Sequence, residues 1–185
     1  MKYLFFTAIV VFVISLSALD FYREDLDFVL SEDQFEVSGT YYFRNDTDQV
    51  INRMLFYPFP TDSLYGDVTS FAAVCVKDSA DVSGGFTVKG ANFRIELQPK
   101  ENAGYFLSYS QEILGKKAEY ILTTTQAWGK PFEEVNYTLE FPKEIILDSL
   151  SFLPDSLNTF DECYKLFYHK KNFMPDRNFQ IIFLP

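Results

Sequence analysis

Carboxylates are the side chains in this sequence that are numerous enough to suggest chemistry. Adjacent acids occur at Glu24-Asp25, Glu32-Asp33, Glu133-Glu134 and Asp161-Glu162. A glycoside hydrolase needs two carboxylates that face each other across a cleft, but neighbours in a strand point to opposite faces. We therefore interpret the acids as a solubilising surface that also discourages edge-to-edge pairing of strands. A hydrolase whose acids meet only in the folded chain stays open as an alternative.

Metal and nucleophile chemistry has few candidate residues. The sequence has one histidine, His169, and two cysteines, Cys75 and Cys163, whereas a zinc site needs several such ligands. No G-x-S-x-G nucleophile motif occurs, and six residues of strand would place Cys163 and His169 roughly 20 Å apart. Oxygen-bearing residues at 45–48 and 62–67 suit calcium, but their pattern is typical of turns. We predict no catalytic residue, no metal and no cofactor, and therefore a protein that is not an enzyme.

One aromatic feature is a candidate for ligand binding. The single tryptophan, Trp128, precedes a Gly-Lys-Pro segment that is typical of a loop between strands. A tryptophan in a loop can stack on a sugar ring or anchor a partner. It can equally close the open end of a sandwich core, because large aromatic side chains are mostly buried. Trp128, Tyr41 and Tyr65 are the candidate ligand-binding residues, and Tyr57 would extend the same patch.

Residues 1–18 have the layout of a secretory signal peptide. A lysine at position 2 precedes an apolar run over residues 4–14, and small residues follow up to Ala18. The run is shorter than the ~20 residues that a membrane-spanning helix needs. We expect cleavage after Ala18 and export to the periplasm, the cell surface or the medium, with no membrane span in residues 19–185. An uncleaved N-terminal anchor stays open as the alternative.

Export would place two cysteines in an oxidising compartment, where they can pair. A disulfide between Cys75 and Cys163 would close a long loop and stabilise the fold by about 4 kcal/mol. Free buried cysteine is also common, so the sequence leaves both alternatives open.

Composition narrows the class of protein. The 185-residue chain carries 26 acidic and 16 basic residues, for a formal net charge of −10, and aromatic residues make up 18% of it. The acidity argues against nucleic acid as a partner, because phosphate binding needs a basic surface. The aromatic content argues against disorder. The length suits one domain, which we assign to residues 19–185.

Alternation of apolar and polar residues predicts strands along the chain. In residues 34–44, Phe35, Val37, Tyr41 and Phe43 share one face and polar residues the other, as in a half-buried strand. No strand is predicted in the acidic stretch that begins at Asp20. Residues 83–85 are predicted to form a turn, and residues 156–165 would form at most a short helix. Further strands are predicted at 51–59, 69–76, 86–88, 93–97, 105–109, 119–124, 135–141, 145–152, 164–168 and 180–183. About ten strands separated by turns predict an all-β fold, an antiparallel β-sandwich of Ig-like or saddle-like form.

Three segments resemble a known domain. They are LQPKENAGYFLSYSQ (residues 97–111), YILTTTQAWGKPFEEVNYTLEFP (120–142) and YYFRNDTDQVINRMLFYPFP (41–60). Together they resemble the N-terminal β-domain of aminopeptidase-N-type metallopeptidases, and they are similar to small secreted bacterial β-sandwich proteins of unknown function. The resemblance implies a β-sandwich. It transfers no catalytic residue, because the HExxH zinc motif of those peptidases does not occur in this sequence.

The sequence therefore favours an exported, non-enzymatic β-sandwich protein that acts in binding or structural assembly at the cell envelope or outside the cell. The alternative is a carbohydrate- or peptide-binding accessory module that uses Trp128 and nearby tyrosines. Under both hypotheses the expected partner is a protein or a glycan.

Overall fold

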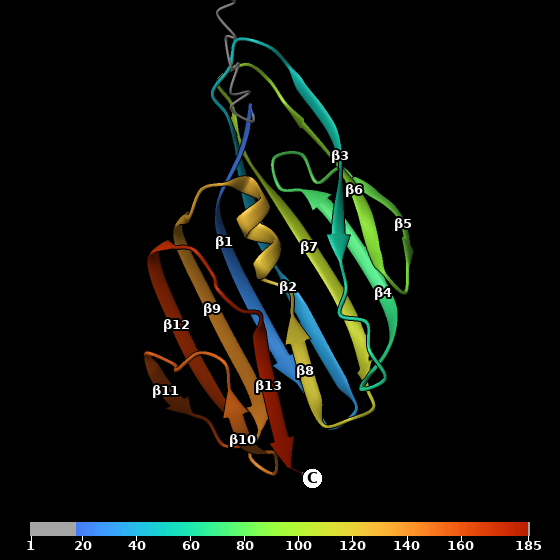
Figure 1. The fold of residues 1–185 in the computed structure, drawn as a ribbon, viewed down its shortest axis with the longest axis vertical. Helices are drawn as coiled ribbons and strands as arrows, with labels where there is room; N and C mark the ends of the chain where they lie inside the picture. Colours follow the sequence, from blue (N-terminus) through green and yellow to red (C-terminus); the bar gives the residue numbers. More distant parts are fainter. Residues whose placement is uncertain (1–17, 185) are drawn as a thin grey trace, which may run out of the picture.

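The computed structural model describes residues 18–184, so the predicted signal peptide, residues 1–18, lies outside the described part of the chain except for Ala18. Thirteen strands and one short 3-10 helix make up the described fold (Figure 1). Seven of the strands form one large sheet. In spatial order they are β11 (Ser156–Thr159), β12 (Cys163–Phe173), β9 (Phe132–Pro142), β1 (Leu19–Leu30), β2 (Gln34–Asn45), β7 (Asn102–Ile113) and β4 (Tyr65–Cys75).

The second layer is split into two smaller sheets. One contains β10 (Ile146–Leu150), β13 (Phe179–Leu184) and β8 (Lys117–Tyr120), and the other contains β3 (Ile51–Pro58), β6 (Gly90–Leu97) and β5 (Ser83–Thr87). The Tyr41 hydroxyl of β2 lies within hydrogen-bond distance of both Tyr57 of β3 and Tyr120 of β8. Both small sheets therefore cover the same face of the large sheet, as Figure 1 shows. Within residues 18–184, β3 and β8 are edge strands with no ladder between them.

The core fills the space between the large sheet and the split layer. The predicted alternation of β2 is confirmed, since Phe35, Val37, Tyr41 and Phe43 are all buried. Rings from both layers stack there, as when Phe28 of β1 lies 4.7 Å from Phe179 of β13 between ring centroids. The all-β sandwich that the sequence predicts is confirmed. One detail of pairing differs, because β1 and β9 run parallel in an otherwise antiparallel sheet.

Several local predictions differ from the structure. Residues 19–30 form β1, a strand that the acidic composition concealed, and 156–165 form the hairpin of β11 and β12 rather than a short helix. All four residues of β11 are exposed, so this edge strand has no apolar alternation to reveal it. The predicted turn at 83–85 lies in β5, which pairs with β6 through an irregular register.

The predicted strand at 119–124 ends at Tyr120, because the helix η1 (Thr123–Trp128) follows it. Three successive threonines favour a strand by propensity. A tertiary contact overrides that preference: the backbone N–H and the hydroxyl of Thr123 both donate to the side-chain oxygen of Asn178, at 3.1 and 2.9 Å.

The candidate disulfide between Cys75 and Cys163 is wrong. Both thiols are free; Cys75 ends β4 and Cys163 begins β12, five strand-to-strand steps across the large sheet. At the usual spacing between strands the two residues are roughly 24 Å apart, whereas a disulfide requires Cα atoms within about 7 Å.

Of the described residues, none belongs to a helix that is long and apolar enough to cross a membrane.

Candidate functional site

A pocket lies where the second layer is split, between the edge strands β3 and β8. Its cavity volume is about 100 Å³. The large sheet contributes Phe21 and Glu24 from β1 and Tyr41 and Phe43 from β2, while Tyr57 and Tyr120 line it from β3 and β8 and Trp128 from η1. We call this the Glu24 pocket. Its walls are mostly aromatic, and its polar groups are one carboxyl and several hydroxyls.

Glu24 is the carboxyl side chain that lines the pocket, and it is buried, with 1% of its surface exposed. Its carboxylate accepts hydrogen bonds from the Tyr120 hydroxyl, at 3.1 Å, and from the Tyr137 hydroxyl of β9. Burial raises the pKa of Glu24 to about 7, and the negative charge of Asp25 adds to this, although the two tyrosine hydrogen bonds oppose it. The carboxyl therefore changes charge near neutral pH.

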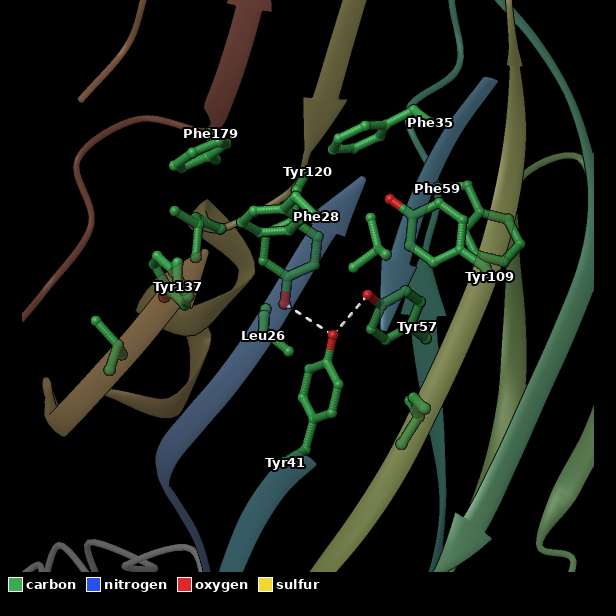
Figure 2. Packing of buried hydrophobic residues seen from close by; sticks show 14 of the residues in the cluster. Leu26, Phe28, Phe35, Tyr41, Tyr57, Phe59, Tyr109, Tyr120, Tyr137 and Phe179 are labelled. Carbon is green, nitrogen blue, oxygen red and sulfur yellow. Dashed lines mark hydrogen bonds between the residues drawn. The ribbon is translucent and has the colours of Figure 1, made fainter. Parts of the chain in front are cut away.

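Tyrosine hydroxyls form a chain that leads to this carboxylate. The Tyr41 hydroxyl lies 2.7 Å from that of Tyr57 and 3.2 Å from that of Tyr120. Figure 2 draws both hydrogen bonds as dashed lines. Because Tyr120 donates its only proton to Glu24, the proton shared with Tyr41 comes from Tyr41, and the one shared between Tyr57 and Tyr41 comes from Tyr57. The chain thus points every donor toward the carboxylate.

These hydroxyls remain protonated at physiological pH. Burial raises the pKa of Tyr41, Tyr57 and Tyr120 well above that of a free phenol, and the neighbouring charge of Glu24 raises each of them further. They act as hydrogen-bond donors and leave Glu24 as the titrating group among them.

Trp128 lines the pocket and packs against two aromatic rings of the large sheet. Its ring lies 5.7 Å from that of Phe21, edge to face, and 6.0 Å from that of Phe43. The helix that carries it is tied down where the Gln126 side chain donates to the Pro175 carbonyl, at 2.9 Å. Gly129 ends the helix with φ of 71°, a left-handed conformation that suits glycine. The indole is half-buried, so it both packs on the core and lines the cavity.

The structure brings together two of the three predicted ligand-binding residues. Trp128 and Tyr41 line the Glu24 pocket, together with Tyr57. Tyr65 lies elsewhere: its hydroxyl donates to Glu119 at 2.6 Å and ties the start of β4 to β8. That carboxylate also accepts hydrogen bonds from Asn178 and Gln180.

Sequence reasoning missed Glu24 and Tyr120 as site residues. A signal for Glu24 is present, since it is in phase with Leu26, Phe28 and Leu30, all of which are buried on one face of β1. A carboxyl on an apolar face is a candidate site residue, because burying it is costly unless it has partners. No comparable signal marks Tyr120, which reads as one more residue of a short strand.

Metal ligands do not gather within residues 18–184, where no group of three or more His, Cys, Asp and Glu residues could hold an ion. His169 is exposed on β12, with its Nδ1 atom 2.7 Å from the side-chain oxygen of Asn136.

Comparison with known proteins relates the chain to others through its fold. No family model matches the sequence, and no curated protein does. A candidate nutrient binding protein from Legionella pneumophila has a similar structure, with a TM-score of 0.67 and 13% identity over 92% of this chain and 68% of the other.

M1 zinc metallopeptidases from Deinococcus radiodurans are also similar. The structure of one has a TM-score of 0.55 and 13% identity, and the match covers 89% of this chain. A mutant of a two-domain M1 zinc metallopeptidase, bound to L-tryptophan, gives a TM-score of 0.55 at 12% identity. The chain spans 42% of the first peptidase and 43% of the second. The resemblance to a β-domain of this peptidase class is confirmed as a likeness of fold.

Proposed function

We propose that the chain is an exported, non-enzymatic binding module that holds a small ligand in the Glu24 pocket. The observation that carries the proposal is the lining of the pocket, which is mostly aromatic with a few convergent polar groups, as in small-molecule sites. The description of the Legionella pneumophila protein as a candidate nutrient binding protein agrees with a binding role. Export rests on the signal-like pattern of residues 1–18.

The cavity volume limits what can enter. An apolar cavity of about 150 Å³ holds one benzene molecule, so the 100 Å³ of the Glu24 pocket suits a head group or one side chain. A whole sugar ring needs more room. The peptide-binding alternative is compatible with this volume if the peptide places one side chain between β3 and β8. A glycan would have to bind outside this cavity.

Ligand binding is tested with the mature protein, residues 19–185, and a screen of small cations, apolar alcohols, amino acids, short peptides and sugars. Binding should raise the unfolding temperature and change the fluorescence of Trp128, the single tryptophan, whose ring lines the pocket. If no class of compound changes either signal at millimolar concentration, the proposed function is wrong.

A variant that fills the pocket provides the control. Leu55→Phe adds volume at a half-buried position that lines the cavity, and it should abolish the response to any compound that binds there. Leu157→Phe makes the same change on the exposed strand β11 and should leave the response intact. A ligand that binds both variants equally would have to occupy another site.

Export is tested separately by fusing residues 1–30 to a reporter enzyme that is active only outside the cytoplasm. We expect activity, and an N-terminus at Leu19 in the mature protein. A cytoplasmic reporter with an intact N-terminus would refute the export part of the proposal.

A further inference from the structure

When Glu24 is ionised, the Glu24 pocket carries a negative charge that no cation in the described part of its lining compensates. Among residues 18–184, no lysine, arginine or histidine lines it. The groups packed around the carboxyl are tyrosine hydroxyls, from Tyr120 of β8, Tyr137 of β9 and Tyr41 of β2, and its neighbour along β1 is the acid Asp25. An ionised Glu24 therefore has hydrogen-bond donors within reach and no cation.

The walls around this charge are ring systems. Phe21, Phe43 and Trp128 contact one another at centroid distances of 4.9 to 6.0 Å, and all three line the cavity. Aromatic rings attract cations through their faces, and quaternary ammonium groups are bound in this way by cages of such rings. The combination of rings and a buried carboxyl favours an organic cation over a neutral apolar ligand.

The hydrogen bonds that Glu24 already makes narrow the chemical class of the ligand further. Each oxygen of Glu24 already accepts a hydrogen bond from a tyrosine, Oε2 from Tyr120 and Oε1 from Tyr137. The protein therefore supplies the hydrogen-bond donors for this carboxylate, and what it does not supply is a positive charge. A weakly hydrated cation with methyl groups gives up little water on entering an aromatic cavity, whereas a hydrated metal ion would need several oxygen ligands. The cavity volume of about 100 Å³ is smaller than the cavity of about 150 Å³ that holds benzene, so the pocket takes only the ammonium end of a ligand and leaves the rest of it outside.

We propose that the Glu24 pocket selects a small alkylammonium group, which the Glu24 carboxylate neutralises and the rings of Phe21, Phe43 and Trp128 enclose. This inference rests on the proposed function, because it names the ligand class of the same pocket. It also assigns Glu24 the role of specificity determinant. The tyrosine chain from Tyr57 to Tyr120 positions that carboxylate.

The direct test compares choline with 3,3-dimethylbutan-1-ol, its uncharged isostere, by isothermal titration at pH 8. We expect choline to bind at least about tenfold more tightly, a difference of about 1.4 kcal/mol. Equal affinity of the two compounds, or tighter binding of the alcohol, would overturn the inference and leave the proposed function standing. Failure of both compounds while another class in the screen binds would do the same, and failure of the whole screen would remove the proposed function as well.

Two substitutions separate the charge of Glu24 from its shape. Glu24→Gln keeps the size of the side chain and should remove the preference for choline over the alcohol. Glu119→Gln is the matched control, because Glu119 is also a tyrosine-bonded carboxyl but does not line the pocket, and the preference should persist there. A Glu24→Gln variant that still prefers choline would refute the role of the carboxylate.

A measurement on the unmodified protein guards against a variant that fails to fold. Choline keeps its charge at every pH, so its affinity should follow the ionisation of Glu24, whose pKa is about 7. Protonation competes with the cation, and the affinity should therefore fall by roughly two orders of magnitude between pH 8 and pH 5. The affinity of the alcohol should change little over that range, and a parallel change in both compounds would contradict the proposal.

Discussion

Two glutamates in this fold have the same kind of partner and opposite electrostatics. Glu24 and Glu119 are both buried, with 1% and 9% of their surfaces exposed, and both accept hydrogen bonds from tyrosine hydroxyls. The pKa of Glu24 is raised to about 7, whereas that of Glu119 is lowered. Burial pushes both values upward, so the difference comes from the other groups around each carboxyl.

Glu119 has the compensation that Glu24 lacks. Besides Tyr65, it accepts hydrogen bonds from Gln180 and Asn178, both at 2.6 Å, and the amine of Lys117 lies 3.6 Å away. These contacts outweigh the cost of burial and hold Glu119 ionised, as a structural tie. The comparison shows that, among the residues described, Glu24 lacks the cationic neighbour and the additional hydrogen-bond donors that Glu119 has. Glu24 also lines a cavity, which a ligand could enter.

The largest expected difference between the two glutamates is in how each makes the stability of the fold depend on pH. A raised folded-state pKa gives Glu24 a stabilising contribution that is present below its ordinary value of 4.5 and is lost as pH rises through about 7. At 1.36 kcal/mol per pH unit, the loss amounts to about 3 kcal/mol. Glu119, whose pKa is lowered, contributes in the opposite sense: its stabilisation is present above the ordinary value and is lost as pH falls through the folded-state value.

Urea unfolding followed by circular dichroism between pH 4.5 and pH 8 measures both contributions. The unfolding free energy of the wild type minus that of Glu24→Gln should fall by about 3 kcal/mol toward pH 8. The same difference for Glu119→Gln should fall toward acid pH instead. Differences that are flat with pH for both variants would mean that the two glutamates are not distinguished by their surroundings.

The next largest expected difference is in the stability lost when a tyrosine near each carboxyl is replaced by phenylalanine. Tyr41→Phe removes the hydroxyl between Tyr57 and Tyr120 and leaves the Tyr57 donor without its acceptor inside the core, which should cost about 2 kcal/mol. Tyr65→Phe removes one of several donors to Glu119 at a half-exposed position, and we expect a loss below about 1 kcal/mol. The same urea titration at pH 7 compares the two, and a larger loss for Tyr65→Phe would reverse the ranking.

Much of the fold was predictable from alternation in the sequence, and the exceptions have physical reasons. The pattern in residues 34–44 predicted β2 because one of its faces is buried and the other is not. The strand β1 escaped because Asp20, Glu24, Asp25 and Asp27 gave it the composition of a surface segment. Its true pattern, with Leu26, Phe28 and Leu30 on one face, becomes clear only when a carboxyl is allowed on the buried side.

The candidate site was predictable in part for a related reason. Trp128 and Tyr41 stood out by residue type, but nothing in one sequence shows that β3 and β8 leave a split in the second layer. That split depends on long-range strand order, and it decides which tyrosines meet Glu24. Residue type alone does not separate Tyr65 from these tyrosines, although the partner of Tyr65 is Glu119 rather than Glu24.

A smaller effect is expected from a substitution that adds a positive charge to the lining of the Glu24 pocket. Leu55→Lys places an amine at a half-buried position that lines the Glu24 pocket, and an opposite charge nearby lowers the pKa of a carboxyl. The loss of stability between pH 4.5 and pH 8 should then shrink by about 1 kcal/mol, and choline should bind more weakly. Leu157→Lys on exposed β11 is the control and should leave both quantities unchanged.

The smallest expected effect is on the fluorescence of Trp128. Its half-buried ring lines the pocket, so iodide should quench it less than a free indole and more than a core tryptophan. Choline should reduce the quenching further, because a bound cation would fill the space beside the indole. The protection should disappear in Glu24→Gln and persist in Glu119→Gln, since only Glu24 shares the cavity with Trp128. Equal protection in both variants would mean that choline meets the indole without the help of the carboxylate, and the contrast between the two glutamates would then have no bearing on binding.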